Sequence, residues 1–234
     1  MRKFDYSFLK RISVPADIMN YATSIYEMKA KAELRRSDFA EVFSAMESVA
    51  KIQSVKSSNA IERIITTDKR IRDIVNKSTA PQGHNELEIA GYRDALDLIH
   101  GSYSEIPFSE KSILELHRIL LQPSGDDLAG RCKTEDNFII ETDREGVRSV
   151  RFTTVPASET AFAMEQLILA YHAAYLEAEI NPLMLITCVI LDLLCIHPFR
   201  NVNGRMSRLL SLLLMYKSGF NAGKYVSIEE QINT

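Results

Sequence analysis

Hydrophobic residues recur three and four positions apart along most of the chain, the spacing that places them on one face of an α-helix. In the stretch DFAEVFSAMESVAKI, the apolar residues with this period are Phe39, Val42, Phe43, Met46, Val49 and Ala50. Ser37 or Asp38 is the candidate N-cap. The same period predicts further helices over 86–100, 109–122 and 158–178. Ser109 and Ser158 are the candidate N-caps of the last two, and the chain is predicted to be mostly helical.

One apolar run, NPLMLITCVILDLLCI (181–196), is predicted to be the central buried helix of a bundle. Asn181 stands at its N-cap and Pro182 at its first helical position, where proline is favoured. The run is apolar on every side except at Asp192. It is shorter than the roughly 20 residues that a membrane-spanning helix needs, so no membrane span is expected.

The segment NFIIETDREGVRSVRF (137–152) breaks the helical pattern. Two short β-prone runs flank an acidic turn that contains glycine, which predicts a β-hairpin with a longer loop. A lone hairpin is only marginally stable. We therefore expect it to lie against the helical body as a flap.

Composition narrows the class of protein. The chain is 46% hydrophobic and 25% charged, with a formal net charge of -3, which is typical of a soluble globular protein and not of a nucleic-acid binder. Cys132, Cys188 and Cys195 form no CxxC pair, and the last two would share one helix face as core thiols of a reducing compartment. The N-terminal segment is basic, but no apolar run follows it. We expect a cytoplasmic protein.

The candidate chemistry lies in the loop HPFRNVNGRMSR (197–208), between the apolar run and a helix predicted over 204–217 that ends at Gly219. Unpaired N–H groups and the positive end of the helix dipole favour an anion at such a helix start. Arg205 and Arg208 are three residues apart, so both guanidinium groups are predicted on one face, where each would grip phosphate oxygens.

The other polar residues of the loop complete a predicted triphosphate clamp with a general base. Asn203 would cap the helix or donate its amide to a phosphate, and Gly204 lets a ligand approach the backbone. His197 is the residue that accepts a proton near neutral pH. Considered one at a time, a histidine such as His197 is more often a core residue, and arginines such as Arg205 and Arg208 are more often ordinary surface charges. Their occurrence together within one short loop favours the clamp.

At these residues the sequence resembles the Fic/Doc (Fido-fold) family, whose motif is HxFx(D/E)GNGRxxR. The positions that match in order and spacing are His197, Phe199, Asn203, Gly204, Arg205 and Arg208. The stretch AGRCKTEDNFII resembles the strip before the family's flap. The stretch SSNAIERI (57–64) resembles the family's N-terminal inhibitory motif (S/T)xxxE(G/N), in which Ser58 and Glu62 match and Arg63 departs.

The resemblance implies an all-α Fido core with a short β-hairpin flap, which transfers AMP from ATP to a hydroxyl of a target protein. His197 would deprotonate that hydroxyl, and Phe199 would fix the loop to the core. Asn203 and Arg205 would hold the phosphates around the attacked phosphorus, while Arg208 would bind the γ-phosphate unless Glu62 occupies it. The target protein would dock on the 138–152 flap by β-augmentation.

The loop departs from the family motif at two positions. Asn201 replaces the acidic residue that holds Mg²⁺ or Mn²⁺, and a neutral amide oxygen is a weaker ligand for a hard cation. Val202 replaces a glycine, and a β-branched residue resists positive φ and crowds a phosphate-binding turn. Both changes predict impaired transfer.

The resemblance divides the chain into an N-terminal helical region over 1–85, which carries the inhibitory motif, and a Fic core over 86–234. The core is expected to be shortened at its C-terminus, with the uncovered surface available to a second copy in a homodimer. For Glu62 there is an alternative, a capping box in which Asn59 is the N-cap of a new helix.

Three functions follow from these predictions. The first is an autoinhibited protein adenylyltransferase that uses ATP. The second is a catalytically inactive module that binds a nucleotide or another phosphate ligand. The third is a helical interaction protein whose loop is vestigial.

Overall fold

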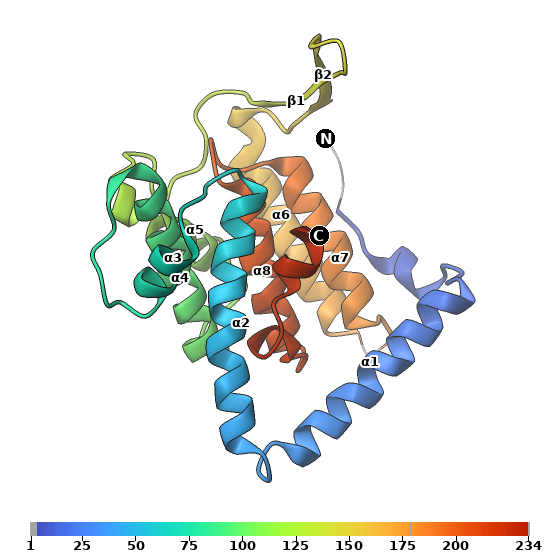
Figure 1. Ribbon diagram of the computed structural model, residues 1–234. Coiled ribbons are helices and arrows are strands. Elements are labelled where there is room, and N and C mark those ends of the chain that lie inside the picture. Colours follow the sequence, from blue (N-terminus) through green and yellow to red (C-terminus); the bar gives the residue numbers. More distant parts are fainter. Residues whose placement is uncertain (1–3, 178, 234) are drawn as a thin grey trace.

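The computed structural model describes residues 4–177 and 179–233 and shows a helical bundle with one projecting hairpin (Figure 1). The helices longer than one turn are α1 (Ala16–Arg35), α2 (Ala40–Ile61), α3 (Asp68–Val75), α4 (Gly83–Ser102), α5 (Glu110–Leu121), α6 (Ala157–Tyr175), α7 (Pro182–Ile196), α8 (Asn203–Lys217) and α9 (Ile228–Asn233). Short 3-10 turns are η1 (Ser7–Lys10), η2 (Gln122–Ser124) and η3 (Ala222–Lys224). The strands are β1 (Phe138–Thr142) and β2 (Arg148–Thr153). The predicted fold class is confirmed.

Two of the predicted N-caps are confirmed. The Ser109 side chain accepts the N–H of Ser112, and the Asn181 side chain accepts the N–H of Leu183 at 2.9 Å. Both bonds satisfy a backbone donor that has no partner within its helix.

The other predicted caps are wrong. At α2, Phe39 holds the N-cap position, and the Ser37 hydroxyl contacts Asp38 Oδ1 instead. At α6 the helix begins before Ser158, because Asp136 from a distant segment accepts the N–H of Ala157 at 2.7 Å. That helix ends at Tyr175, and residue 178, its predicted end, lies outside the described residues.

The centre of the bundle is α8 and not α7. Ten of the residues of α8 are buried, and the helix contacts α2, α4, α5 and α7. In α7 one side faces solvent, where Leu191 is 57% exposed, so the prediction of a fully buried central helix is wrong for that run. The end of α8 agrees with the sequence, since Gly219 has φ 82° and the N–H of Phe220 closes the helix on the carbonyl of Met215 at 2.8 Å.

At the N-terminal side, α1 and α2 meet at a sharp elbow and diverge from it (Figure 1). No residue of α1, all of which is described, is buried. The apolar face predicted at the start of α2 is also largely outside the core: Phe39, Val42 and Val49 are exposed, and burial begins at Ala50. The helical period therefore predicts these helices correctly but not what their apolar faces contact.

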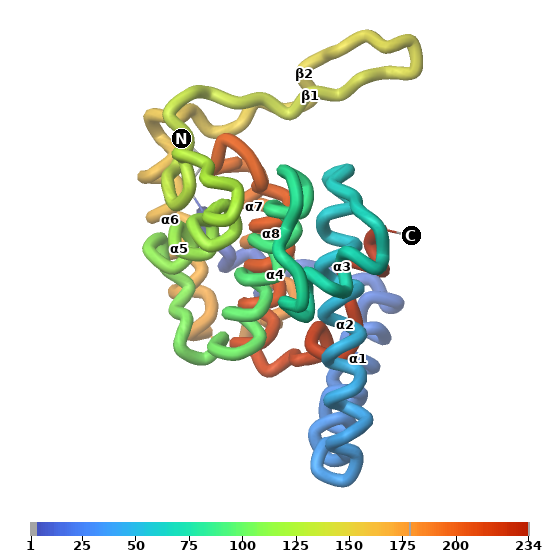
Figure 2. Tube along the Cα trace, turned by 60° about the vertical axis from the view of Figure 1, so that its left-hand side comes forward, coloured from blue at the N-terminus to red at the C-terminus, as the bar shows by residue number. Residues whose placement is uncertain are grey.

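The predicted hairpin is confirmed, but it does not lie against the helices. Its antiparallel strands pair from Phe138 with Thr153 to Thr142 with Arg148. They project from one end of the bundle (Figure 2), and Phe138 is 51% exposed. The ends of the hairpin are held by hydrogen bonds of Asn137 and Thr154, so packing of its face on the body is not required.

The cysteines are half-buried and free, which agrees with reduced thiols but makes them less buried than core residues. Burial raises the pKa of the Cys188 thiol. In the described part of the chain, no helix combines the length and the apolar composition that crossing a bilayer requires.

Candidate active site

The loop 197–202 leaves α7 and enters α8 through two residues in the left-handed region. His197 has φ 52° and ψ 61° at the end of α7, and Val202 has φ 63° and ψ 13° just before α8. Val202 therefore adopts a left-handed conformation that favours glycine, contrary to the expectation that a β-branched residue would resist it. Its side chain packs against the core. The departure from the motif thus places a β-branched residue in a strained backbone conformation.

This strain gives a stability prediction with a matched pair of variants. Val202→Gly and Val202→Ala both lose the side-chain packing, but only alanine keeps a Cβ at positive φ. We expect Val202→Gly to be more stable than Val202→Ala by about 1 kcal/mol, as measured by urea denaturation. Equal stabilities, or a more stable alanine variant, would show that the loop is not left-handed at this position.

The loop is clamped from within by Asn203. The N–H of Phe199 donates to Asn203 Oδ1 at 3.0 Å, and Asn203 Nδ2 donates to the carbonyl of Phe199 at 2.7 Å. Asn203 therefore bonds the loop backbone and does not cap α8, while its contact with a phosphate stays a prediction.

Phe199 fixes the loop to the core, as the resemblance implied. Its ring is fully buried and stacks on the imidazole of His117, with ring centroids 3.8 Å apart. His117 Nδ1 accepts the N–H of Gly130 at 3.0 Å. Burial lowers the pKa of His117 to about 4, so its ring stays neutral beneath the loop.

The depressed pKa of His117 predicts acid sensitivity. Between the ordinary value of 6.5 and the folded value of about 4, the unfolded chain binds a proton that the native chain does not, so stability falls as pH falls through this window. The loss is on the order of 2 kcal/mol near pH 5. Thermal melts at pH 7 and pH 5 should show a smaller shift in His117→Gln than in the natural protein, and an equal shift would contradict this assignment.

His197 is suited to act as a base. It is half-buried, and Nδ1 lies 3.3 Å from the carbonyl of Leu194, so a proton on Nδ1 leaves Nε2 as the acceptor. Burial lowers the pKa of His197, with a further contribution from the charge of Lys133. The imidazole is therefore neutral near pH 7, as proton abstraction requires.

At the N-terminal turn of α8, Arg208 is held by the end of α2. Its Nη2 donates to Glu62 Oε1 at 2.8 Å and to the carbonyl of Ser58 at 2.9 Å, and its Nε donates to the Ser58 hydroxyl at 2.8 Å. A Cβ on Gly204 would lie 2.4 Å from Glu62 Oε1, so this carboxylate rests on the backbone of α8 where an anion is favoured. The contact between Glu62 and Arg208 predicted from the sequence is present.

The capping-box alternative is wrong. α2 ends at Ile61 with Glu62 as its C-cap, so no helix begins here. Asn59 lies inside the last turn, and its Nδ2 donates to the carbonyl of Val55 at 2.7 Å. Arg63, which departs from the inhibitory motif, follows with φ 63°, a conformation typical of Gly or Asn after a helix.

Arg205 lies near Arg208, since both side chains contact the end of α2, but Arg205 is buried. It is 4% exposed, forms an ion pair with Glu88 of α4, and lies 3.4 Å from the Asn59 side chain. In this structure the charge of Arg205 is paired with Glu88, and its contact with phosphate stays a prediction. Tertiary pairing with a carboxylate on another helix, which sequence spacing does not reveal, takes Arg205 into the core.

The residues of the loop do not fit a divalent cation. The stretch 197–208 contains no Asp or Glu, and Asn201 is exposed. Within residues 4–177 and 179–233, no group of three or more His, Cys, Asp or Glu side chains is placed to hold a metal ion. We derive no step through a metal.

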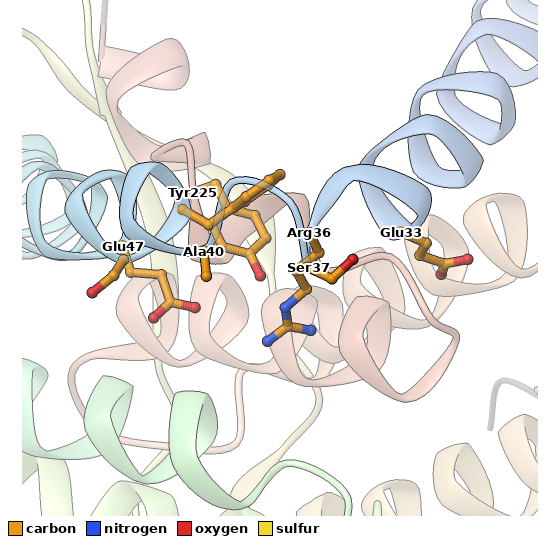
Figure 3. Close-up of a pocket in the computed structure, with 8 residues that line it drawn as sticks. Glu33, Arg36, Ser37, Ala40, Glu47 and Tyr225 are labelled. Atoms are coloured by element: carbon orange, nitrogen blue, oxygen red, sulfur yellow. The ribbon is translucent and has the colours of Figure 1, made fainter.

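Several hollows of the surface lie away from this loop. A cavity of about 550 Å³ lies at the elbow of α1 and α2, and its lining includes Arg36, Glu47 and Tyr225 (Figure 3). A second cavity of about 310 Å³ adjoins it and is lined mostly by apolar side chains. Neither is lined by a predicted site residue, so the open, polar surface at the start of α8 remains the candidate site.

Comparison with known proteins agrees with this geometry. Residues 107–215, which run from before α5 into α8 and include the loop, match the model of the Fic/DOC family. This part of the chain is similar to the Fic/DOC family, and the structure has the Fic fold. No curated protein sequence matches the chain.

Solved structures extend the likeness in fold. A Fic family protein from Desulfovibrio desulfuricans G20 is 18% identical with a TM-score of 0.77, over 95% of this chain and 64% of that one. A Fic domain containing signaling protein from Bacteroides thetaiotaomicron VPI-5482 is 21% identical with a TM-score of 0.70, over 83% and 73%. Fic-1 from C. elegans is 22% identical with a TM-score of 0.61, over 86% and 60%. The chain thus spans less than two thirds of the first and the last of these proteins.

Sequence analysis missed several residues that shape the site. Glu88, which neutralises Arg205, looks like an ordinary surface position of an amphipathic helix. His117, beneath Phe199, is one polar residue in an apolar period. Lys133 lies in the strip AGRCKTEDNFII, and the resemblance of that strip to the family assigns the lysine no role. In each case the partner is distant in sequence, so no local pattern indicates the contact.

Proposed function

We propose that the chain is a Fic-type protein adenylyltransferase, which transfers AMP from ATP to a hydroxyl of a target protein, and that Glu62 inhibits it. The observation that carries the proposal is the Glu62 carboxylate at the start of α8, bonded to Arg208 on the motif helix. A carboxylate in that position is a stand-in for an anionic ligand, because it uses the same guanidinium and the same helix end.

In the proposed reaction, His197 Nε2 takes the proton of the target hydroxyl. The hydroxyl oxygen attacks the α-phosphorus of ATP, and a new P–O bond forms. The bond from the α-phosphorus to the oxygen that bridges to the β-phosphate breaks, and pyrophosphate leaves with its electron pair. Catalysis of this kind rests on positioning and charge stabilisation, here from Arg208 and the N–H groups at the start of α8.

The other motif residues act indirectly in this proposal. Asn203 keeps the loop closed around the backbone of Phe199. Arg205 is buried and neutralised by Glu88, and in this proposal it meets a phosphate only after that ion pair opens. Arg208 is thus the guanidinium that a γ-phosphate would meet once Glu62 is displaced.

The hairpin is the proposed docking strand for the target. It is a two-stranded sheet, so each strand has an outer edge not paired by the other. Its strands are exposed along nearly their whole length. An extended target segment adds to such an edge through main-chain hydrogen bonds.

In the test, the Glu62→Gly protein is incubated with a mixture of proteins and with ATP that is labelled on either the α- or the γ-phosphate. The measurement is the label incorporated into the Glu62→Gly protein or into the other proteins. Adenylyl transfer incorporates the α-label alone. Incorporation of the γ-label would indicate phosphoryl transfer instead. If neither label is incorporated, the transferase proposal is wrong. Glu62→Gln is the matched control, since it keeps the side-chain shape and removes the charge.

A second candidate, an inactive nucleotide-binding regulatory module, is favoured by one observation: the loop contains no carboxylate. This module would bind ATP in Glu62→Gly, as seen by calorimetry, without incorporation of either label.

A further inference from the structure

Lys133 is a buried lysine beneath the loop, and it has no role in the reaction proposed above. It is 5% exposed, and it lies between α5 and the hairpin, outside the loop motif. Burial lowers the pKa of its ammonium group. A buried cation is costly unless polar partners satisfy it, so its hydrogen bonds indicate what it holds in place.

The ammonium group contacts both ends of the flap. Lys133 Nζ donates to Asn137 Oδ1 at 2.8 Å, immediately before β1, and to the Thr154 hydroxyl at 2.9 Å, immediately after β2. The Thr154 hydroxyl also lies 2.7 Å from the carbonyl of Asn137. The two chains that enter and leave the flap thus meet at one cation.

The same lysine contacts the backbone on both sides of His197. Its Nζ donates to the carbonyl of Ile196 at 3.2 Å, and its own N–H donates to the carbonyl of Pro198 at 2.8 Å. Asn137 adds a bond from Nδ2 to the carbonyl of Phe199 at 3.0 Å. Three backbone carbonyls around His197 therefore accept hydrogen bonds from Lys133 or Asn137, at the base of the flap.

We propose that Lys133 is a positioning residue, which joins the base of the flap to the backbone of His197 and so aligns a docked target strand with the base. This inference rests on the proposed function for its consequence, but the linkage itself is a property of the fold. A target held on the flap would otherwise be placed independently of His197, and small misplacements cost large factors in rate.

The charges around this linkage are few. Lys133 is the charged side chain that acts on the pKa of His197, and Asp136 and Cys132 act on Lys133. Removing the ammonium charge should therefore raise the pKa of His197 toward its ordinary value.

The experiment uses Lys133→Met, with Lys133→Arg as the conservative variant and Thr154→Val as a milder break in the same linkage. In Lys133→Met, NMR titration should show a higher His197 pKa, and amide hydrogen exchange at the hairpin ends and at residues 196, 197 and 199 should be faster. In Lys133→Arg, which keeps the positive charge, the His197 pKa should equal that of the natural protein. If Lys133→Met does not fold, Thr154→Val should still speed exchange at these backbone groups.

Transfer is the second readout. In the Glu62→Gly background, Lys133→Met should lower the AMP-transfer rate by about tenfold or more while ATP affinity stays the same. Unchanged exchange and an unchanged His197 pKa in a folded Lys133→Met protein would overturn the inference, whatever the activity. Altered exchange and pKa with no transfer in any variant would instead count against the proposed function and leave the linkage in place.

Discussion

Replacing Asn201 with Asp and Val202 with Gly, in a Glu62→Gly background, is expected to raise AMP transfer by about two orders of magnitude over Glu62→Gly alone. Asn201→Asp supplies the carboxylate that the loop lacks. Val202→Gly removes a β-branched side chain from a left-handed position at the start of α8. The measurement is a time course of α-labelled AMP incorporation.

The single replacements serve as controls for this repair. Because both positions act on the same bound triphosphate, the two gains should not simply add. Circular dichroism establishes that each variant is folded. A repaired protein that binds ATP and transfers nothing would show that the loop is not the limiting defect, and the regulatory-module function would then be the better account.

Replacing His197 in the same background is expected to lower AMP transfer by a factor of about 100 to 10,000, the usual contribution of a positioned base. His197→Asn is the sharper variant, since asparagine tolerates the left-handed backbone of this position, whereas His197→Ala tests the loss of the whole ring. ATP affinity should be unchanged, because the imidazole acts on the target hydroxyl. Residual transfer equal to that of Glu62→Gly would remove His197 from the mechanism.

The pH profile is a second test of the base. Since the folded pKa of His197 lies below the ordinary value of 6.5, the neutral ring persists to lower pH than in a free histidine. The acid limb of the rate profile should therefore fall with a midpoint below 6.5. A midpoint above that value would indicate a different base.

The helices could be predicted because their signal is local. The period of apolar residues locates α4, α5 and α8, and short polar side chains mark the starts of α5 and α7. What could not be predicted was which helix lies at the centre. α7 is more apolar than α8, yet Leu191 faces solvent, because burial depends on how many neighbours surround a helix.

In the candidate site, too, the local features could be predicted from spacing and the contacts between distant segments could not. The spacing of His197, Gly204 and Arg208 is local and predicted the loop, and the resemblance predicted that Glu62 would reach Arg208. The spacing of Arg205 from Arg208 predicts a phosphate contact for both residues. The pairing of Arg205 with Glu88 joins two helices that are far apart along the chain, and only the tertiary structure shows it.

The two departures from the family motifs have one physical feature in common. Arg63 and Val202 both stand at positions where the motif has a residue that tolerates positive φ, and both adopt φ 63°. The backbone shape at these turns is therefore set by the surrounding helices, and the side chain adapts to it at a cost. Neither substitution therefore removes the positive φ at its turn.

The central claim is that Glu62 occupies the place of an ATP phosphate on Arg208. Its most direct test is calorimetric titration of ATP into three proteins: the natural chain, Glu62→Gly, and Glu62→Gly combined with Arg208→Ala. We predict that Glu62→Gly binds ATP roughly tenfold more tightly than the natural chain, because a charge-assisted contact no longer competes, and that Arg208→Ala removes this gain. Equal affinities of the natural chain and Glu62→Gly, or a gain that survives Arg208→Ala, would contradict the claim.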